Sequence, residues 1–280
     1  MLITVWGCRG SLPTPGPDTL RYGGNTTCVD IVLHDGRRMI IDAGSGVRFL
    51  GKELVQQQTG GTFCLMLTHS HWDHLMGFPF FTPAYDARFH FNVCGGRDAQ
   101  HSLQAYLQHQ MEPPYFPVSF DAMKAGFTFG CKGPCRGPLG DSTVATIPLN
   151  HPNGGYGFKV TERGRSFVFL PDNEIGFAHP GGPSRDEFIA FCRDADVLFH
   201  DAQYTDEEYQ RTRGWGHSTF SAATALAMDA RVKRVGLFHH DPDRTDDALD
   251  EQLKRCHEHI TRRDATTECF IVAEGMQIEL

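Results

Sequence analysis

The sequence of 280 residues contains no run of about 18 consecutive apolar residues, the length that a membrane-spanning helix requires. This absence excludes insertion into a bilayer and leaves only peripheral contact with a membrane. The N-terminal residues 1–7, MLITVWG, also lack the basic flank and long apolar stretch of a secretory signal, and instead predict a strand that enters a glycine turn. We therefore expect a cytoplasmic protein.

The chain also has fewer basic than acidic residues. The chain has 26 Lys and Arg against 34 Asp and Glu, which gives a formal net charge of -8. Because long nucleic acids are bound largely through Lys and Arg contacts to phosphates, this balance disfavours a long nucleic acid as partner. A small phosphate compound remains compatible, since divalent cations in a pocket can outweigh the mean charge of a surface.

Cysteine spacing does not indicate a disulfide framework. The nine cysteines are scattered, and a chain of this length does not need covalent cross-links, so we expect reduced, packed thiols. Cys131 and Cys135 form a C-x-x-x-C pair in a loop rich in glycine and proline, and they could supply two ligands of a structural zinc ion. Cys8 and Cys94 are possible partners, but nothing selects them.

With 40% hydrophobic residues, the chain can bury a full core. We expect a single domain over residues 1–280, with a loop-rich insertion at about 84–140. Hydrophobic spacing predicts strands at 31–33, 39–41, 63–67, 142–149, 157–161, 166–170, 197–199, 235–238 and 269–272, and helices at 47–57, 98–111, 186–194, 218–229 and 246–260. This alternation of strands and helices is typical of the α/β class.

A dense group of potential metal ligands follows the predicted strand at 63–67. His69, His71, Asp73 and His74 lie within six residues of one another. Imidazole nitrogens and a carboxylate are ligands that suit Zn²⁺ and its first-row neighbours. A histidine-rich surface loop is the alternative, which the position behind a buried strand disfavours. Because one tetrahedral ion cannot readily take four ligands from so short a loop, we expect two metal ions.

Three more polar residues, His151, Asp172 and His239, stand at the ends of predicted strands. A buried loop histidine is the alternative interpretation of His151. His240 adjoins His239, and either side chain could face the metals. We favour His239 because it follows its strand directly and alternation then directs His240 elsewhere. These residues would complete a site for two divalent ions, with zinc as first choice and manganese or iron also compatible.

An H-x-H-x-D-H motif after a strand, followed by a distant His, Asp and His at strand ends, resembles the metallo-β-lactamase superfamily over nearly the whole chain. The resemblance implies a four-layer αββα sandwich with a dinuclear site at one edge. It implies that His69, His71 and His151 hold the first metal, Asp73, His74 and His239 the second, and that Asp172 bridges them. Asp42 would be a structural carboxylate behind the site, and Asp73 would have a catalytic role besides binding metal.

The segment Gly216-His217-Ser218-Thr219 resembles the H-S-T element of ribonuclease Z within this superfamily. The resemblance implies that His217 serves phosphoester cleavage. A metal pair can aim a hydroxide at phosphorus, while an imidazole that binds no metal protonates or stabilises the departing oxygen. A histidine that merely precedes a helix is the alternative. His200, which follows the predicted strand at 197–199, is expected to support the site from behind.

The chain departs from ribonuclease Z in length, because only 20 residues separate His151 from Asp172. That spacing leaves no room for the long arm with which ribonuclease Z grips transfer RNA. The segments 7–11, 22–28 and 151–156 resemble armless relatives, which include bacterial cyclic-nucleotide phosphodiesterases, the cyclic phosphodiesterase of phosphonate breakdown and phage anti-Pycsar nucleases. The resemblance implies a homodimer that hydrolyses a small cyclic phosphodiester, above all a cyclic nucleotide.

Three other functions remain open. An endonuclease acting on RNA 3′ ends, like ribonuclease Z, is disfavoured by the charge and the missing arm. A carbon-ester or lactone hydrolase would share the metal site but give His217 no role. A non-enzymatic binding module would have little use for a bridging carboxylate. Phe80, Phe81, Tyr115 and Phe116 could stack on a base, although core packing explains each of them at least as well.

Overall fold

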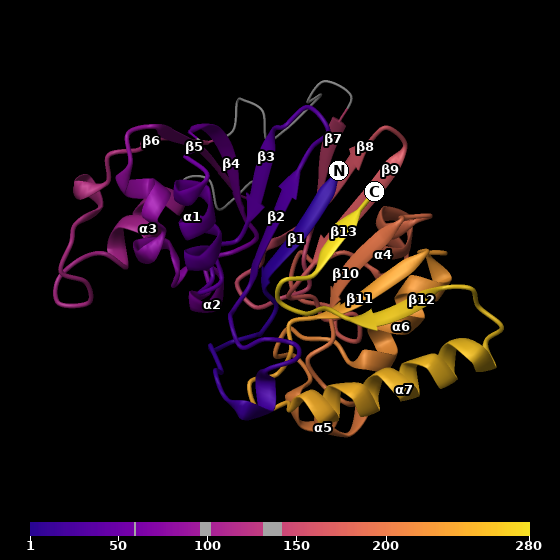
Figure 1. Cartoon of the computed structure of the whole chain (residues 1–280). Coiled ribbons are helices and arrows are strands. Elements are labelled where there is room, and N and C mark those ends of the chain that lie inside the picture. The colour runs from indigo at the N-terminus through magenta and orange to yellow at the C-terminus, as the bar shows by residue number, and fades with distance from the viewer. Residues whose placement is uncertain (59, 96–101, 131–141) are drawn as a thin grey trace.

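The computed structural model describes residues 1–58, 60–95, 102–130 and 142–280, and its strands form two sheets that pack face to face (Figure 1). In the described residues, the first sheet has the strand order β13-β1-β2-β3-β4-β5-β6 and the second has the order β12-β11-β10-β9-β8-β7. None of the helices in these described ranges combines the length and apolar character that crossing a membrane requires.

The first sheet consists of β1 (Leu2–Gly7), β2 (Cys28–Val32), β3 (Arg38–Ile41), β4 (Gly61–Leu67), β5 (Phe89–Gly95), β6 (Gly126–Phe129) and β13 (Gln277–Glu279). β1 pairs antiparallel with β13 and β2, and β2 forms an antiparallel hairpin with β3 across the Asp35-Gly36 turn. From β3 to β6 the strands run parallel, so that their carboxyl ends lie at one edge of the sheet.

The second sheet consists of β7 (Ser142–Pro148), β8 (Tyr156–Glu162), β9 (Arg165–Leu170), β10 (Val197–Asp201), β11 (Arg234–Phe238) and β12 (Glu268–Ile271). β7, β8 and β9 form an antiparallel meander, whereas β9 to β12 run parallel. Polar residues that follow β9, β10 and β11 therefore meet at a common edge, where ligand sites of parallel sheets usually lie.

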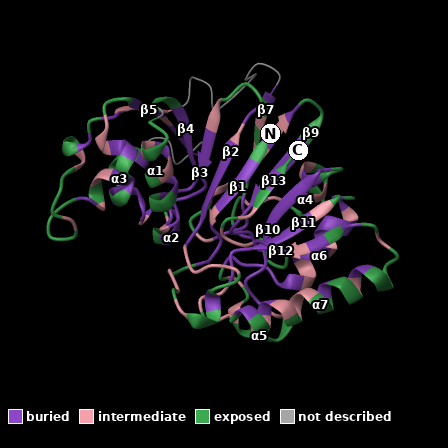
Figure 2. Cartoon of the chain, in the orientation of Figure 1, coloured by how far each residue is buried: buried purple, intermediate pink, exposed green. Residues whose placement is uncertain are grey.

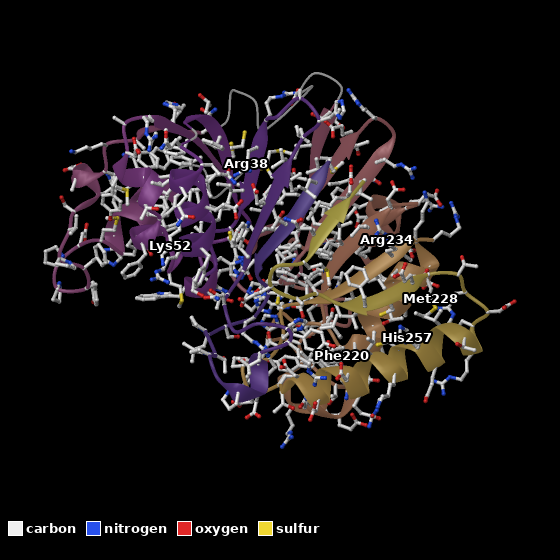
Figure 3. All side chains as sticks on the ribbon, in the orientation of Figure 1. Arg38, Lys52, Phe220, Met228, Arg234 and His257 are labelled. Carbon is white, nitrogen blue, oxygen red and sulfur yellow. The ribbon has the colours of Figure 1, made fainter. Side chains whose placement is uncertain are left out.

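Alternating side chains along the strands create separate apolar layers. In β9, Phe167 and Phe169 enter the core between the sheets together with Ile3 of β1, whereas Val168 and Leu170 face the helices on the outer side. This alternation follows from the pleat of a strand, which sends successive side chains to opposite faces. Figure 3 shows the side chains filling the space between the two sheets.

The helices are α1 (Val47–Gln56), α2 (Trp72–Leu75), α3 (Leu103–His109), α4 (Arg185–Cys192), α5 (Asp206–Thr212), α6 (Phe220–Asp229) and α7 (Asp246–Arg262). Short 3-10 turns lie at Pro17–Thr19, Phe78–Phe80, Thr82–Tyr85 and Phe120–Ala122. α1 and α3 pack on the outer face of the first sheet, and α4, α6 and α7 on that of the second (Figure 1). Their outward sides are exposed while the strands are largely buried (Figure 2). The expected four-layer αββα sandwich is confirmed.

Several boundaries differ from the sequence prediction for local reasons. The helix expected from residue 218 begins at Phe220, because Thr219 is the N-cap and its side chain accepts the Ala222 N–H. α3 covers only Leu103–His109 of the helix expected at 98–111, of which residues 98–101 lie outside the described part. β5 and β6 were not expected, and β5 pairs with β4 along its whole length.

The described cysteines only partly follow the expectation of reduced thiols. Free thiols occur at Cys8, Cys28, Cys192, Cys256 and Cys269. Cys94 is disulfide-bonded, so the expectation is wrong at this position, because sequence spacing does not reveal which sulfur atoms approach within bonding distance. Cys131 and Cys135, expected as two ligands of a structural zinc ion, lie outside the described residues.

Candidate metal centre

The H-x-H-x-D-H motif lies at the carboxyl end of β4, where the chain turns into α2, and Asp42 at the end of β3 organises this turn. Asp42 Oδ1 accepts the Thr68 N–H at 2.7 Å, and Oδ2 accepts the Thr68 hydroxyl at 2.8 Å. Asp42 Oδ2 also lies 2.7 Å from His74 Nδ1. The carboxylate thereby turns His74 so that Nε2 points to the centre, which is the place that the resemblance implies for Asp42.

Residues of the second sheet face this motif, since His151 follows β7, Asp172 follows β9 and His239 follows β11. Asp172 Oδ1 lies 3.0 Å from His74 Nε2 and 3.3 Å from His239 Nε2. Asp172 Oδ2 lies 3.7 Å from Nε2 of both His69 and His151. The two oxygens of one carboxylate thus face two different groups of histidines.

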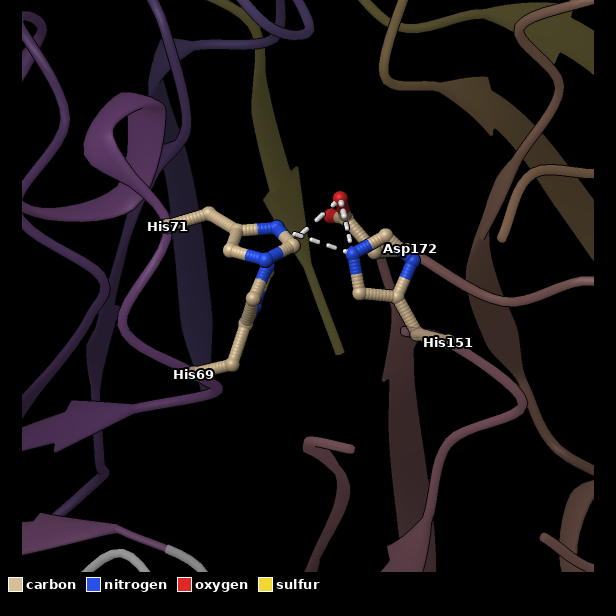
Figure 4. A group of neighbouring side chains, drawn as sticks. All are labelled: His69, His71, His151 and Asp172. Carbon is tan, nitrogen blue, oxygen red and sulfur yellow. Dashed lines mark hydrogen bonds and ion pairs between the residues drawn. The ribbon is translucent and has the colours of Figure 1, made fainter. Parts of the chain in front are cut away.

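The predicted ligands form two overlapping groups. The first consists of His69, His71, His151 and Asp172, and the second of Asp73, His74, Asp172 and His239. Within each group, one potential ligand atom per residue lies within 4.8 Å of the others. Figure 4 shows the first group, in which His69 and His71 approach from one side and His151 and Asp172 from the other. All seven residues predicted from the sequence therefore come together at one edge of the two sheets.

Four of the histidines are held by their outer ring nitrogen. The Nδ1 atoms of His69, His74, His151 and His239 lie within 3.0 Å of Thr68 Oγ1, Asp42 Oδ2, Gly216 O and Gln203 Oε1, respectively. Such contacts fix the ring orientation and leave Nε2 facing the centre, as is usual for histidines that bind metals. His71 differs, because its Nδ1 faces His151 Nε2 at 3.0 Å.

Buried polar atoms without hydrogen bonds mark the same place. Within the described part of the chain, His69 Nε2, His74 Nε2 and Asp172 Oδ1 are buried and have no hydrogen-bond partner, although they lie close to one another. An unsatisfied buried polar atom costs about 1–3 kcal/mol, and a divalent ion in each ligand group would together satisfy all three. The donor set of imidazoles and carboxylates therefore fits two divalent metal ions.

The ionisation states of His69, His151 and Asp172 suit metal binding, which requires neutral imidazole and ionised carboxylate, whereas Asp172, Asp73 and Asp42 outweigh the effect of burial and raise the pKa of His74 well above its usual value. Burial lowers the pKa of His151 to about 4 and that of His69 well below its usual value. Burial opposes the ionisation of Asp172, but His239 and His74 outweigh it and hold the pKa of this carboxyl well below its usual range.

Backbone geometry at two positions is specific to the site. His239 adopts φ 59°, a left-handed conformation that is uncommon for residues other than glycine and that turns its ring back toward Asp172. Gly216 adopts φ 96°, and a Cβ atom there would lie 2.1 Å from His151 Nδ1. Glycine is therefore required for the Gly216 carbonyl to reach His151.

His217 lies beside both ligand groups. Its ring stacks on that of His239 with a centroid distance of 5.0 Å and meets that of His151 at 5.2 Å. His217 Nδ1 lies 2.7 Å from Asp201 Oδ2, at the end of β10. Burial lowers the pKa of His217, but the Asp201 carboxylate outweighs this effect and raises the pKa to about 9. Because Nδ1 is engaged, Nε2 is the nitrogen that can serve a ligand.

The neighbouring histidines lie outside the cluster. His240 Nε2 donates to the Val272 carbonyl at 2.8 Å, and the ring meets Tyr22, so that His239 is the member of the pair that faces Asp172. His200, expected to support the site, is buried, and its Nδ1 lies 2.7 Å from the Asp201 carbonyl oxygen.

Sequence reasoning missed four residues that position the cluster: Ser11, Glu174, Asp201 and Gln203. The Ser11 N–H donates to Asp73 Oδ2 at 2.8 Å, and the Gly216 N–H donates to Glu174 Oε2 at 2.8 Å. Asp201 could have been found, because it directly follows His200 at a predicted strand end. Glu174, Gln203 and Ser11 carry no comparable signal, since their partners are distant in sequence.

Comparison with known proteins agrees with this geometry. The model of a family described as "Beta-lactamase superfamily domain" matches residues 37–240, which is more than half of the chain and includes all seven predicted ligands. The chain belongs to this superfamily. Its two-sheet architecture is the metallo-β-lactamase fold, as the sequence motif implied. Family and cluster together make it a metal-dependent hydrolase of that fold.

Individual superfamily members are similar over the full length. Ribonuclease Z of Haloferax volcanii is 23% identical over 331 residues, which covers 100% of this chain and 95% of that protein. The metallo-β-lactamase fold protein YhfI from Bacillus subtilis superposes with a TM-score of 0.68 at 16% identity, covering 99% of both chains. A diphosphatase from the PhnP family gives a TM-score of 0.66 at 17% identity, covering 100% of this chain and 97% of that one.

Proposed function

We propose that this protein is a phosphodiesterase that hydrolyses a small cyclic phosphodiester, with cyclic nucleotides as the substrate class. The observation that carries the proposal is the division of the Asp172 oxygens between two histidine groups, with His217 stacked beside them. The short connection of 20 residues between His151 and Asp172 and the net charge of -8 support a small substrate over a long RNA.

In this proposal His69, His71 and His151 would hold one divalent ion, Asp73, His74 and His239 would hold the other, and Asp172 belongs to both groups. We propose zinc, with manganese or iron compatible with the same ligands. When bound, such an ion pair supplies Lewis acidity and activates water for attack on phosphorus. Asp73, fixed by the Ser11 N–H, both binds metal and helps to orient the nucleophile.

His217 has the separate role of serving the leaving oxygen. Its Nδ1 is bound to Asp201, which fixes the ring plane against His239. Nε2 then holds the proton that passes to the departing alkoxide when the P–O bond breaks. Because a positioned acid or base contributes about 10²–10⁴-fold to a rate, His217→Ala should lower kcat within that range.

The experiment that tests the proposal is release of linear monophosphate from a panel of 3′,5′- and 2′,3′-cyclic nucleotides. Native protein, a chelated sample, His217→Ala and the surface control His34→Ala are compared, since His34 is exposed. We expect turnover that is lost on chelation, strongly reduced in His217→Ala and retained in His34→Ala. Absence of turnover of every panel member by the zinc-loaded protein would contradict the proposal.

A second candidate is an RNA endonuclease like ribonuclease Z, which is favoured by the relative from Haloferax volcanii that covers the whole chain. Precursor transfer RNA is the discriminating substrate. Cleavage of this RNA with salt-sensitive affinity would favour the second candidate. Hydrolysis of a carbon ester or lactone that is unaffected by His217→Ala would instead favour a carbon-ester hydrolase.

We further propose that the chain acts as a homodimer, as its resemblance to the superfamily implies. Light scattering coupled to size-exclusion chromatography measures this directly. A particle of twice the chain mass is expected, and a monomer at assay concentration would contradict the proposal.

A further inference from the structure

An aromatic cavity adjoins the metal-binding loop. Trp72, Tyr106 and Tyr115 line a cavity of about 270 Å³ together with Ser70 and His109. The three aromatic side chains are 69%, 42% and 67% exposed, respectively. Large aromatic surfaces gathered around one exposed cavity indicate a binding site more strongly than scattered exposed residues do.

The position of the cavity ties it to the metal centre. Ser70 and Trp72 alternate along the chain with His69, His71 and Asp73, so that the loop presents ligands on one side and a cavity wall on the other. α2 buries Asp73 and His74 and leaves Trp72 exposed at its first turn.

A second cavity extends the first. It has a volume of about 310 Å³, shares Ser70 and Tyr106 with the aromatic cavity, and reaches His69 and Asn153. The two cavities therefore lie side by side along the metal-binding loop, an aromatic one at Trp72 and a more polar one at Asn153.

We propose that Trp72, Tyr106 and Tyr115 form a subsite for the planar aromatic base of the substrate. This inference rests on the proposed phosphodiesterase function and specifies the residues that bind the base of its nucleotide substrate. Stacking of a base on an aromatic side chain contributes about 1–3 kcal/mol, and it tolerates different bases because every base has a π face. The subsite therefore recognises the presence of a base more than its identity.

The size of the cavity limits the ligand. Pockets for small molecules usually measure about 300–1,000 Å³, and the aromatic end lies just below that range. It accommodates one ring system, and the adjoining polar cavity accommodates a sugar, but neither holds a strand of nucleotides. His109 packs edge-on against Tyr115 with a centroid distance of 6.2 Å and contacts Glu112 at 2.9 Å, which gives the subsite a polar rim.

The four aromatic residues suggested by the sequence divide accordingly. Tyr115 lines the cavity. Phe81 is fully buried and packs against Phe91, so that it belongs to the core. Phe80 is exposed but packs edge-on against Phe116 with a centroid distance of 5.4 Å.

Two substrates with the same six-membered cyclic phosphate test the subsite. One is 3′,5′-cyclic AMP, and the other is the cyclic phosphate of 1,3-propanediol, which has no base. We expect Trp72→Ala and Tyr115→Ala to lower the ratio of the two kcat/KM values about tenfold each, which corresponds to about 1.4 kcal/mol of stacking. Trp72→Phe should retain most of the ratio. Phe49→Ala, at a residue on α1 that is 42% exposed, is the matched control and should leave it unchanged.

Binding to metal-free protein provides a readout that does not depend on turnover. AMP should quench the tryptophan fluorescence of the native chain, ribose 5-phosphate should not, and Trp72→Leu should abolish the quenching. Equal effects of Trp72→Ala on both substrates, or absence of quenching by AMP, would overturn the subsite. If the zinc-loaded protein hydrolyses no member of the cyclic-nucleotide panel, the phosphodiesterase proposal fails, and the quenching result tests the subsite separately.

Discussion

Glu174 joins the loop of the proposed bridging carboxylate to the loop of His217. Its side chain is fully buried. Oε1 accepts the Tyr209 hydroxyl at 2.6 Å and the Gly214 N–H at 2.7 Å, while Oε2 accepts the Gly216 N–H at 2.8 Å and lies 2.9 Å from His179 Nε2. Because the Gly216 carbonyl in turn holds His151, Glu174 positions a proposed ligand without touching a metal.

Replacement of this carboxylate should weaken metal binding. Glu174→Gln places an amide group against backbone N–H donors, so that His151 loses its fixed orientation. Residues that orient metal ligands typically contribute about 10–100-fold to affinity, and we expect a loss of that size for zinc. Competition with a chromophoric chelator measures it. Tyr209→Phe, which removes one hydrogen bond and keeps both backbone contacts, is the control and should stay within about threefold of the native affinity. Equal affinities of Glu174→Gln and native protein would contradict this role.

At the scale of secondary-structure elements, the β2–β3 hairpin buries a carboxylate away from the metal centre. Asp30 of β2 is 3% exposed, and its Oδ1 lies 3.5 Å from Nε of Arg38, which is labelled in Figure 3. Burial raises the pKa of Asp30 to about 7, and Arg38 offsets this effect only in part. The folded chain therefore keeps the Asp30 proton to a higher pH than the unfolded chain, whose ordinary value is 3.8.

The sign of the resulting pH dependence follows from proton linkage. Between pH 3.8 and about 7 the folded state binds more protons, so that the free energy of unfolding falls as the pH rises through this window. In the native protein, Asp30 should lower the free energy of unfolding by about 2 kcal/mol between pH 5 and pH 8, and Asp30→Asn should remove this decrease. Urea unfolding at the two pH values measures the difference. The exposed control Asp18→Asn should keep the native pH dependence, and an unchanged decrease in Asp30→Asn would contradict the raised pKa.

At the scale of the whole molecule, the proposed metal site connects the two sheets. His69 to His74 follow a strand of the first sheet, whereas His151, Asp172 and His239 follow strands of the second. An ion bound by both groups contacts ligands that unfolding separates. Metal binding should therefore stabilise the fold as a unit.

Zinc should accordingly raise the melting temperature of chelated protein. If zinc binds only the folded state, a free zinc concentration of 100 times Kd raises the free energy of unfolding by about 2.7 kcal/mol. Asp172→Asn should reduce this shift in melting temperature, because the substitution replaces one carboxylate oxygen by an NH2 group and leaves the other as a neutral amide oxygen. Asp18→Asn should leave the shift unchanged. Differential scanning calorimetry with and without zinc measures both. A zinc-independent melting temperature in the native protein would contradict the proposed site.

Many strands and helices and the ligand motif could be predicted because each depends on residues that are close in sequence. The H-x-H-x-D-H motif and the apolar strand before it are contiguous, and the strand Arg165–Leu170 likewise contains a short continuous apolar run. α5 escaped prediction because it has no buried residue and is instead marked by the capping box of Thr205 and Glu208. β5 and β6 escaped because parallel pairing with β4 depends on contacts distant in sequence.

The sequence by itself determined the α/β class and the four polar residues that follow β4, since the first rests on the alternation of predicted strands and helices and the second on a short spacing, whereas His151, Asp172 and His239 were predicted from strand ends and the family resemblance. Only the tertiary structure decided that the Asp172 oxygens face separate histidine groups and that Asp201 and Glu174 position His217 and His151. It also showed that His239, at a left-handed backbone position, faces Asp172, whereas His240 contacts the Val272 carbonyl. The physical reason is that parallel strands bring their carboxyl ends together from distant parts of the chain, so that partnerships between side chains exist only after the sheets have formed.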